Sequence, residues 1–492
     1  MSLSLSFDIG RSSLSTSADR TSVVTRNVAR ADDPDATRKS VAAVTLYGGG
    51  VQAGGAQRAT DSVLFDGLLS SNSRLGAQAA VKAGLDQYST AIGDASQERS
   101  PAALLGKLQN SLQALSVAPH DTASAEAVVN AGLDLANQLN VLSSTISDIR
   151  QTADADISRS VLSMNTLLAE FDEVNTSIVI GTHSGDDVTD QMDRRDAILK
   201  ELSGEVEIRS IVRENNDMVV FASGGLTLFE RSPRSVGFES TPILPAGSTG
   251  SSMFVDGIAL DAADASGNVE GGRIAGLLYL RDTVAPALQK QLDEVARNLV
   301  QVFAESDQSA VPTLADQPGL FTFAGATGVP PANTIVDGLA SQIQVNPNVI
   351  PSQGGDLGLL RDGGISDPLN AAYSYNLAGH TGFNGRINEL IGGLNSAVGF
   401  DPAAGLGETG DLVSYAADSE AWLQELRSNT TRVYEYEAVF SERAVEALSS
   451  ATGINIDEEM IELLDLERSY QASSRLLQVL DDMFNSLFAA TR

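Results

Sequence analysis

The feature that most constrains the fold is a regular pattern of apolar residues in LDLERSYQASSRLLQVLDDMFNSLF, residues 464–488. Two series of positions, offset by three and each repeating every seven residues, run through this region: Leu463, Tyr470, Leu477 and Phe484, and Leu466, Ser473, Leu480 and Leu487. Spacings of three and four place these side chains along one side of a helix. The periodicity alone fits a core helix of a compact domain as well as a helix that packs lengthwise on another. Because no Gly or Pro follows Gly453, the pattern predicts one uninterrupted helix.

A second helical pattern lies near the N-terminal end and offers a partner for the first. Its positions also alternate spacings of four and three: Leu3, Phe7, Gly10, Leu14, Ser17, Thr21, Val24, Val28 and Ala31. The opening MSLSLSF alternates with period two, as a strand does, but only the helical spacing continues beyond Leu14. Residues 1–45 carry six Arg/Lys and five Asp/Glu (net +1), and residues 453–492 carry three Arg and eight Asp/Glu (net −5). Opposite charges beside two apolar faces favour one coiled coil built from both terminal segments, although such charge runs are also typical of solvated faces.

Composition restricts the possible partners. The 492 residues suggest roughly three domains. With 32 Lys plus Arg against 64 Asp plus Glu, the formal net charge is −32, which opposes binding to nucleic acid and to anionic membranes. There is no cysteine, so disulfides and thiolate chemistry are excluded. The opening MSLSLSFDIG has neither the basic start nor the apolar block of a cleaved secretion signal, so we expect no such signal and no membrane insertion.

The middle of the chain alternates between segments with a helical pattern and segments that are rich in β-strand and loop signals. Apolar residues follow a near-continuous helical face over residues 128–164, and a helix of roughly 50 residues there would be about 75 Å long. Residues 271–307 and 411–450 give two more long amphipathic patterns, so we expect a bundle of long helices. Residues 206–229 alternate around an Asn-Asn pair, which predicts a hairpin. Residues 230–270 and 308–400 collect most of the Pro and Gly and are typical of loop-rich insertions.

These patterns predict a mainly α fold with β-rich insertions, organised as a terminal coiled coil, a rod of long helices and an outer β-rich domain. Residues 1–45 and 453–492 are expected to be the two halves of the coiled coil. The rod is expected to comprise residues 46–205, 271–307 and 401–452, and the outer domain residues 206–270 and 308–400.

A search for catalytic or ligand-binding motifs gives little. His120, His183 and His380 are far apart and lie outside any metal-binding spacing, so surface or packing roles are favoured. GLGETG (405–410) has the G-x-G-x-x-G spacing but follows no strand, so a flexible lead into the next helix is favoured over a dinucleotide site. We therefore expect no catalytic residue, no cofactor and no metal.

The terminal segments resemble the bacterial flagellar axial proteins. RNVARADDPDATRK (26–39) is similar to that family's N-N-I-A-N-A-N-T-P-G-Y-S-R-Q signature, with matches at Asn27, Val28, Ala29, Ala31, Pro34 and Arg38. Asp33, Asp35 and Ala36 depart from it. Residues 452–488 resemble the family's S-G-V-N-L-D-E-E opening followed by a helix with Y-Q-A-S, here Tyr470–Ser473. Three middle blocks, DQMDRRDAILKELSGEVEIRS, EGGRIAGLLYLRD and IQVNPNVI, resemble the hook-associated members at the junction of hook and filament.

This resemblance implies a structural subunit that is exported through the flagellar type III channel and self-assembles into a ring in the bacterial flagellum. It implies terminal helices lining an inner tube, hook protein on one side, a second junction protein or flagellin on the other, and an export chaperone on the C-terminal helix. The assembly interface is then expected to include Leu3, Phe7, Leu14, Val24, Asn27, Val28, Pro34, Leu463, Leu466, Tyr470, Leu477, Leu480, Phe484 and Leu487.

Two alternatives stay open. One is another axial protein, either the hook subunit or the second junction protein. A hook subunit is expected to lack the long helix before Asp187 and the MDRRDAILKEL block. The other is an extracellular acidic hydrolase whose catalytic carboxylates lie in the β-rich part.

Overall fold

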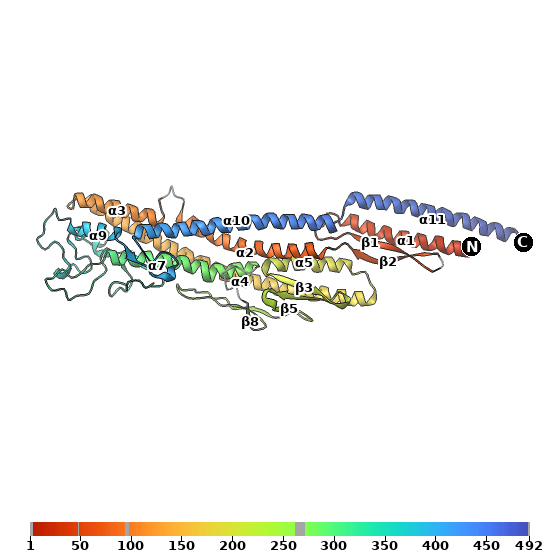
Figure 1. Cartoon of the computed structure of the whole chain (residues 1–492), viewed down its shortest axis with the longest axis horizontal. Coiled ribbons are helices and arrows are strands. Elements are labelled where there is room, and N and C mark those ends of the chain that lie inside the picture. Colours follow the sequence, from red (N-terminus) through yellow and green to blue (C-terminus); the bar gives the residue numbers. More distant parts are fainter. Residues whose placement is uncertain (1–2, 48, 94–97, 261–270, 491–492) are drawn as a thin grey trace.

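A single helix of 63 residues, α4 (Thr122–Ser184), sets the length of the body of the molecule. At 1.5 Å per residue it spans about 95 Å. It begins where the Asp121 carboxylate accepts a hydrogen bond from the backbone N–H of Ser124. It ends at Gly185, whose φ of 79° is the left-handed conformation that favours glycine. A buried apolar stripe runs along almost its whole length, so α4 is the central element of a rod rather than of a globule (Figure 1).

The computed structural model describes residues 3–47, 49–93, 98–260 and 271–490. The other helices are α1 (Leu3–Ala29), α2 (Ser62–Ile92), α3 (Pro101–Val117), α5 (Thr189–Glu205), α6 (Arg273–Tyr279), α7 (Ala285–Val302), α8 (Leu359–Asp362), α9 (Gly385–Asn395), α10 (Leu412–Thr452) and α11 (Ile456–Ala490). A π-helical turn (Leu280–Val284) joins α6 to α7. The strands are β1 (Lys39–Thr45), β2 (Val51–Arg58), β3 (Ile208–Val212), β4 (Met218–Ala222), β5 (Thr227–Phe229), β6 (Val236–Phe238), β7 (Met253–Val255), β8 (Ile258–Leu260), β9 (Phe321–Phe323), β10 (Ile343–Val345), β11 (Val398–Gly399) and β12 (Thr409–Gly410).

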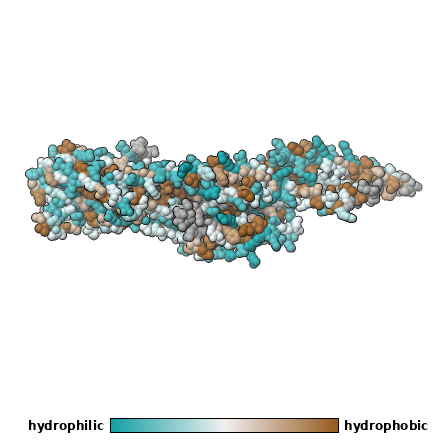
Figure 2. Space-filling model, in the orientation of Figure 1, coloured by the Kyte–Doolittle hydropathy of each residue, from teal (hydrophilic) through white to brown (hydrophobic). Residues whose placement is uncertain are grey.

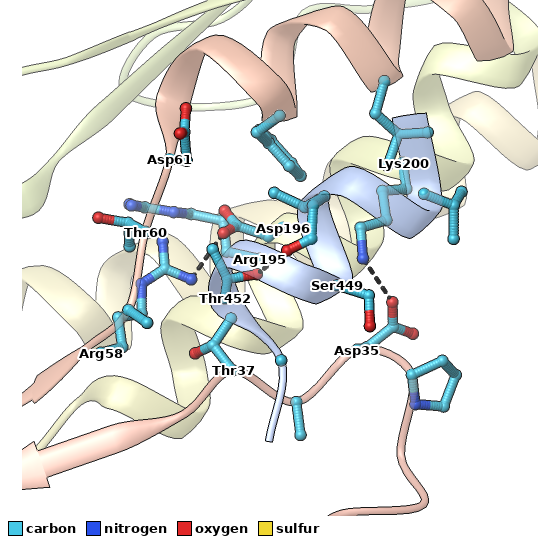
Figure 3. A pocket seen from close by; sticks show the side chains of 18 of the residues that line it. Asp35, Thr37, Arg58, Thr60, Asp61, Arg195, Asp196, Lys200, Ser449 and Thr452 are labelled. Atoms are coloured by element: carbon cyan, nitrogen blue, oxygen red, sulfur yellow. Dashed lines mark hydrogen bonds and ion pairs between the residues drawn. The ribbon is translucent and has the colours of Figure 1, made fainter. Parts of the chain in front are cut away.

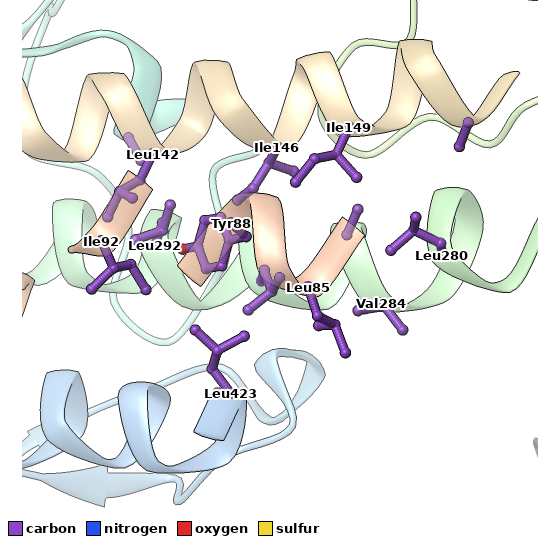
Figure 4. Close-up of a cluster of buried hydrophobic side chains, with 14 of the residues drawn as sticks. Leu85, Tyr88, Ile92, Leu142, Ile146, Ile149, Leu280, Val284, Leu292 and Leu423 are labelled. Carbon is purple, nitrogen blue, oxygen red and sulfur yellow. The ribbon is translucent and has the colours of Figure 1, made fainter. Parts of the chain in front are cut away.

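Four helical segments meet in the core of the rod. Figure 4 shows side chains from α2, α4, the α6–α7 segment and α10 converging on one apolar cluster. Leu85 and Tyr88 of α2, Ile146 of α4, Leu292 of α7 and Leu423 of α10 are all buried. Because each long helix contributes one apolar side and keeps its polar side in water, the bundle buries a continuous core along its axis.

Two small antiparallel sheets flank the rod beside α4 and α5 (Figure 1). In the order β3-β4-β5, Phe229 packs edge-on against Phe171 of α4, with ring centroids 4.8 Å apart. The turn between β3 and β4 contains Asn215 and Asn216, with φ of 56° and 58°. Asn is among the residues that tolerate this conformation, which explains why an Asn-Asn pair marks the hairpin.

The second sheet, β6-β7-β8, is attached to the rod by buried polar contacts. Asn165 of α4 donates to the carbonyl of Val236 at 2.9 Å. The Arg281 guanidinium pairs with Asp154 at 2.6 Å, and both side chains are almost fully buried. The second oxygen of Asp154 accepts from Ser240 Oγ at 2.6 Å. These contacts hold the sheet in a defined place along the rod.

Residues 308–400 lie at the far end of the rod, away from β3–β8 (Figure 1). They contain β9, β10, α8, α9 and β11, joined by loops and short 3₁₀ turns. Residues 206–270 and 308–400 are expected from the sequence to form one outer domain. Residues 206–260 and 308–400 instead lie at different positions along the rod, and residues 261–270 lie outside the described residues. The expected domain boundary between residues 45 and 46 also falls inside one structural unit, because β1 and β2 on either side of it form a single hairpin.

The terminal helices α1 and α11 lie side by side beyond the other end of the rod, with both chain ends pointing away from it (Figure 1). We call them the terminal pair. The predicted fold class is confirmed: the protein is mainly helical, with long terminal helices and small antiparallel sheets in its middle part. The predicted helix of roughly 50 residues corresponds to α4, which is longer, at 63 residues.

We predict that Phe171→Ala destabilises the rod by about 3–5 kcal/mol, because it leaves a cavity in a fully buried site between α4 and β5. Leu162→Ala, on the 65% exposed face of the same helix, is the matched control and should change the free energy of unfolding by less than about 0.5 kcal/mol. Urea unfolding followed by circular dichroism measures both. Equal effects would show that Phe171 is not part of the core.

Candidate assembly interface

The terminal pair is antiparallel, and its contacts are close. Ser13 Oγ and Ser473 Oγ are 3.0 Å apart, and the rings of Phe7 and Phe484 meet edge to face at 6.4 Å. At Gly10, an added Cβ would lie 2.9 Å from a methyl carbon of Leu477. A larger residue at this position would force the Leu477 side chain to shift, so a small residue in the N-terminal pattern has a packing role.

The predicted interface residues are distributed unevenly over the pair. Val24, Asn27, Leu466 and Leu480 are buried. Half-buried residues are Leu14, Val28, Leu463, Leu477 and Phe484, and exposed ones are Phe7, Pro34, Tyr470 and Leu487. Leu3 belongs to α1, but its side chain lies outside the described residues. The buried residues of the regular apolar pattern therefore pack between α1 and α11 within the single chain.

Helix α11 also exposes apolar side chains in addition to those that pack on α1. We call them the outer face of α11; they form two groups, Ile456, Met460, Ile461 and Leu464 near its start, and Val479 and Met483 further along. Figure 2 shows apolar side chains reaching the surface among hydrophilic ones along the terminal pair. Single exposed apolar residues are ordinary, but a group of them on one helix is typical of a surface that another protein covers.

Where the terminal pair meets the rod, one carboxylate is fully buried. Glu459, in the first turn of α11, is 0% exposed. Its oxygens accept from Asn27 Nδ2 at 2.9 Å and from Arg38 Nε at 2.6 Å. Asn27 also donates to the carbonyl of Lys39 at 2.8 Å, and Arg38 reaches Glu462 at 3.1 Å. The end of α1, the chain that follows it and the start of α11 are thus joined through one charged centre.

A row of aspartates connects this centre to the rod. Asp187, Asp190, Asp193 and Asp196 are spaced by three residues, just before and within the first half of α5. They face four cations from the N-terminal segment: Arg26, Arg30, Lys39 and Arg58. Arg26 pairs with Asp187 at 2.7 Å, and Arg58 pairs with Asp196 at 2.6 Å. Together with Glu459, Asn27 and Arg38, these residues form what we call the joint.

The joint also shifts the acidity of its carboxyls. Burial alone would raise the pKa of Asp190, but the hydrogen bond from Lys39 and the charges of Lys39, Arg30 and Arg26 outweigh it and lower the pKa below its usual value. Burial would also raise the pKa of Asp187. Hydrogen bonds from Thr189 and Arg26 outweigh burial, so this pKa is lowered as well. Both shifts favour the ionised form and thus the ion pairs.

A cleft of about 680 Å³ opens beside the joint (Figure 3). Its apolar lining includes Phe65, Leu68, Met218, Leu448 and Ile454. Two of its cations are paired: Lys200 contacts Asp35 at 2.8 Å, and Arg58 contacts Asp196. The lining also includes Asp32, Asp61 and Asp66, so acidic side chains outnumber basic ones around the cleft. Arg195 also lines the cleft; burial lowers its pKa to about 10, and its Nε has no hydrogen-bond partner.

In the part of the chain that the structure describes, no group of three or more His, Asp or Glu side chains is placed to hold a metal ion. None of the helices described there has the length and apolar character needed to cross a membrane.

Most residues of the joint were not predicted from the sequence to take part in an interface. Glu459 lies seven residues before Leu466, at a position where the second heptad series would place an apolar residue. This break in the series was the one signal in the sequence for a buried polar contact there. Three of the four aspartates, Asp190, Asp193 and Asp196, lie in the DQMDRRD block, which served above only as a mark of resemblance. Their three-residue spacing places acids on one side of a helix, but the cations that meet them are more than 100 residues away.

We predict that acid weakens the joint. The lowered pKa values of Asp187 and Asp190 contribute stability that is present above their unfolded-state pKa of about 4 and is lost as the pH falls through the folded-state pKa. Hydrogen exchange of α1 and α11 should therefore be slower in the wild type than in Asp190→Asn at pH 6, and the difference should shrink toward pH 2. A constant difference would contradict the role of the ionised carboxylate.

We also predict that Arg38→Met loosens the terminal pair by about 3 kcal/mol, because it leaves the buried Glu459 carboxylate without its cation. Arg20→Met is the control: its ion pair with Glu462, at 2.9 Å, is partly exposed and should contribute about 0.2–1 kcal/mol. The double variant Arg38→Met/Glu459→Gln should recover part of the loss. Hydrogen exchange in α11 measures all three, and indistinguishable single variants would refute the role of the joint.

Comparison with known proteins identifies both parts of this arrangement. The family model "Flagellar hook-associated protein FlgK helical domain" matches residues 85–323, which contain most of the rod and the sheets β3–β8. The model "Flagellar basal body rod FlgEFG protein C-terminal" matches residues 447–489, which contain nearly all of α11 and Glu459.

A curated protein and a solved structure are also similar to this chain. Flagellar hook-associated protein 1 of Bacillus subtilis (strain 168) is 23% identical over 407 residues, which cover 78% of this chain and 75% of that protein. The solved structure of the flagellar hook junction protein FlgK from Burkholderia pseudomallei is 19% identical, with a TM-score of 0.43. That structural match covers 53% of this chain and less than half, 47%, of the other. The family models and the Bacillus subtilis relative together support the FlgK family of flagellar hook-associated proteins for this chain.

Proposed function

We propose that this protein is a structural subunit of the bacterial flagellum that joins the hook to the filament and has no enzymatic role. Its similarity to the FlgK family supports this function. The structural observation that carries it is the terminal pair: α11 uses one side to pack on α1 and keeps apolar residues on its outer face. A second surface of this kind, on a helix already paired, suits a subunit whose neighbours complete its burial.

We propose a location and partners on the same basis. The subunit is exported by the flagellar type III route and assembles with copies of itself into a ring in the flagellum, with the terminal pair toward the axis. Hook protein then adjoins it on one side, and a second junction protein or flagellin on the other. An export chaperone that covers the outer face of α11 before assembly would keep these apolar residues from aggregating.

The two alternatives receive less support. The match of residues 85–323 to the FlgK helical domain favours the junction protein over the hook subunit and the second junction protein. For a hydrolase, a carboxyl with a raised pKa would be expected in an open cleft. Burial raises the pKa of Asp66, which lines the cleft beside the joint, so this criterion alone does not decide against a hydrolase. The pKa of Asp293 is raised to about 7 by burial, but this side chain is 0% exposed and accepts backbone hydrogen bonds from Gly338 and Ala340, both at 2.8 Å. Asp293 therefore organises the core of the rod.

We predict that Leu464→Asp blocks assembly without unfolding the subunit. Leu464 is 49% exposed on the outer face of α11, so a charge there should change the stability of the isolated subunit by less than about 0.5 kcal/mol. Burying the same unpaired charge between subunits would cost several kcal/mol. Expressed in a strain that lacks this protein, the variant should leave hooks without filaments in electron micrographs, while its melting temperature stays that of the wild type.

Two controls separate assembly from export. Val117→Asp replaces an apolar residue that is 87% exposed on α3, away from the terminal pair, and should build normal filaments. The amount of secreted protein must also be measured, because a chaperone that binds the outer face would be affected by the same change. A Leu464→Asp subunit that is exported and still builds normal filaments would refute the proposal.

A further inference from the structure

The hairpin β1–β2 ends in an uncovered apolar tip. Its two strands extend from the joint along α1, and Thr45 and Val51 form the last pair of the ladder at its far end. Val44 is 51% exposed and Leu46 44%, and Tyr47 is fully exposed. A two-stranded hairpin contributes little stability by itself, and exposed apolar residues at its tip are a liability unless something covers them. We call Val44, Leu46 and Tyr47 the hairpin tip.

The hairpin tip cannot be covered by the cleft of its own chain. The cleft is lined by Arg58, Ala59 and Thr60, which lie at the base of the hairpin. The tip lies at the other end of strands of seven and eight residues, about 20 Å away at roughly 3.3 Å per residue. In Figure 1 the hairpin runs from the joint toward the chain ends, whereas the cleft lies at the joint.

The chemistry of the cleft suits the hairpin tip. The segment from Val44 to Gln57 carries no charged residue, so it brings no net charge into the cleft. The cleft has an apolar floor, and the charges of Lys200 and Arg58 on its walls are already paired (Figure 3). A volume of about 680 Å³ lies within the roughly 300–1,000 Å³ of clefts that receive ligands or short peptide segments.

We infer that the hairpin tip of one copy of this chain docks into the joint cleft of a second copy. Tip and cleft are different surfaces of the same molecule, so the contact is head-to-tail, and repeating it generates a ring or a helical array. The inference rests on the self-assembly in the proposed function and specifies the contact by which neighbours join. It also places Tyr47, which contacts nothing at the surface of the single chain, between subunits.

Substitution of Tyr47 tests the energetics. Tyr47→Ser removes a fully exposed side chain, so the melting temperature of the monomer should stay unchanged, whereas self-assembly should weaken about ten- to hundredfold because the aromatic ring is no longer buried. Tyr47→Trp keeps a large aromatic and should assemble substantially better than Tyr47→Ser. Sedimentation of assembling protein over a concentration series measures both. Wild-type assembly by Tyr47→Ser would overturn the inference.

Disulfide mapping tests the geometry, because the natural chain contains no cysteine. Thr45→Cys/Ser449→Cys places one thiol beside the hairpin tip and one on the cleft while leaving Val44, Leu46 and Tyr47 intact. Mild oxidation of assembled subunits should give a ladder of cross-linked multimers. The control Thr45→Cys/Val117→Cys carries its second thiol far from the cleft and should give none.

The outcomes distinguish the inference from the function on which it rests. If the variants support filaments but give no ladder, the docking contact is wrong while the junction function stands. If cross-linking captures another flagellar protein instead of a second copy, the occupant is wrong. If a strain that lacks this protein still builds normal filaments, the proposed function itself is wrong, whatever the cross-links show.

Discussion

The burial of the Glu459 carboxylate is the constraint on which the arrangement of the two ends depends. A charge with no solvent exposure requires compensation from both a cation and hydrogen-bond donors. Here Arg38 supplies the cation and Asn27 the amide, and both belong to the other end of the chain. The start of α11 therefore has one position relative to α1, and the aspartate row on α5 extends the same principle to the rod. Orientation at the joint is determined by charge geometry more than by apolar area.

Much of the helical architecture could be predicted from local patterns. The stripe along α4 is long and unbroken, and residues such as Asp121 and Gly185 mark its ends with the hydrogen bonds and backbone conformation that helix termini require. The Asn215-Asn216 turn was likewise visible, because few residue types tolerate positive φ. The pairing of α1 with α11 followed from two matching periods and opposite charge. In each of these cases the determining interactions lie close together in sequence or repeat along it.

The remaining features depend on contacts between distant residues, which no local pattern reveals. Glu305, for example, fixes the far-end loops by accepting from the backbone N–H groups of Ile365 and Ser366, some 60 residues away. Such loops have irregular backbones and no period, so residues 308–400 could be recognised as irregular but not placed. For the interface, the apolar period identified the side chains of the pair but not which of its two sides faces outward. Ile461 and Val479 belong to neither heptad series, yet both are among the exposed apolar residues of α11.

The chain between α10 and α11 has a mechanical consequence. α10 spans 41 residues and α11 35, and only Gly453, Ile454 and Asn455 separate them. An added Cβ at Gly453 would lie 2.4 Å from the carbonyl oxygen of Ser449, so the chain passes its own helix end too closely for any other residue. A tight link of this kind transmits tension along the axis but resists bending poorly. Lateral stiffness at this point therefore depends on the charged contacts beside it, of which salt screens the partly exposed Arg26–Asp187 pair more than the contact of Arg38 with the buried Glu459.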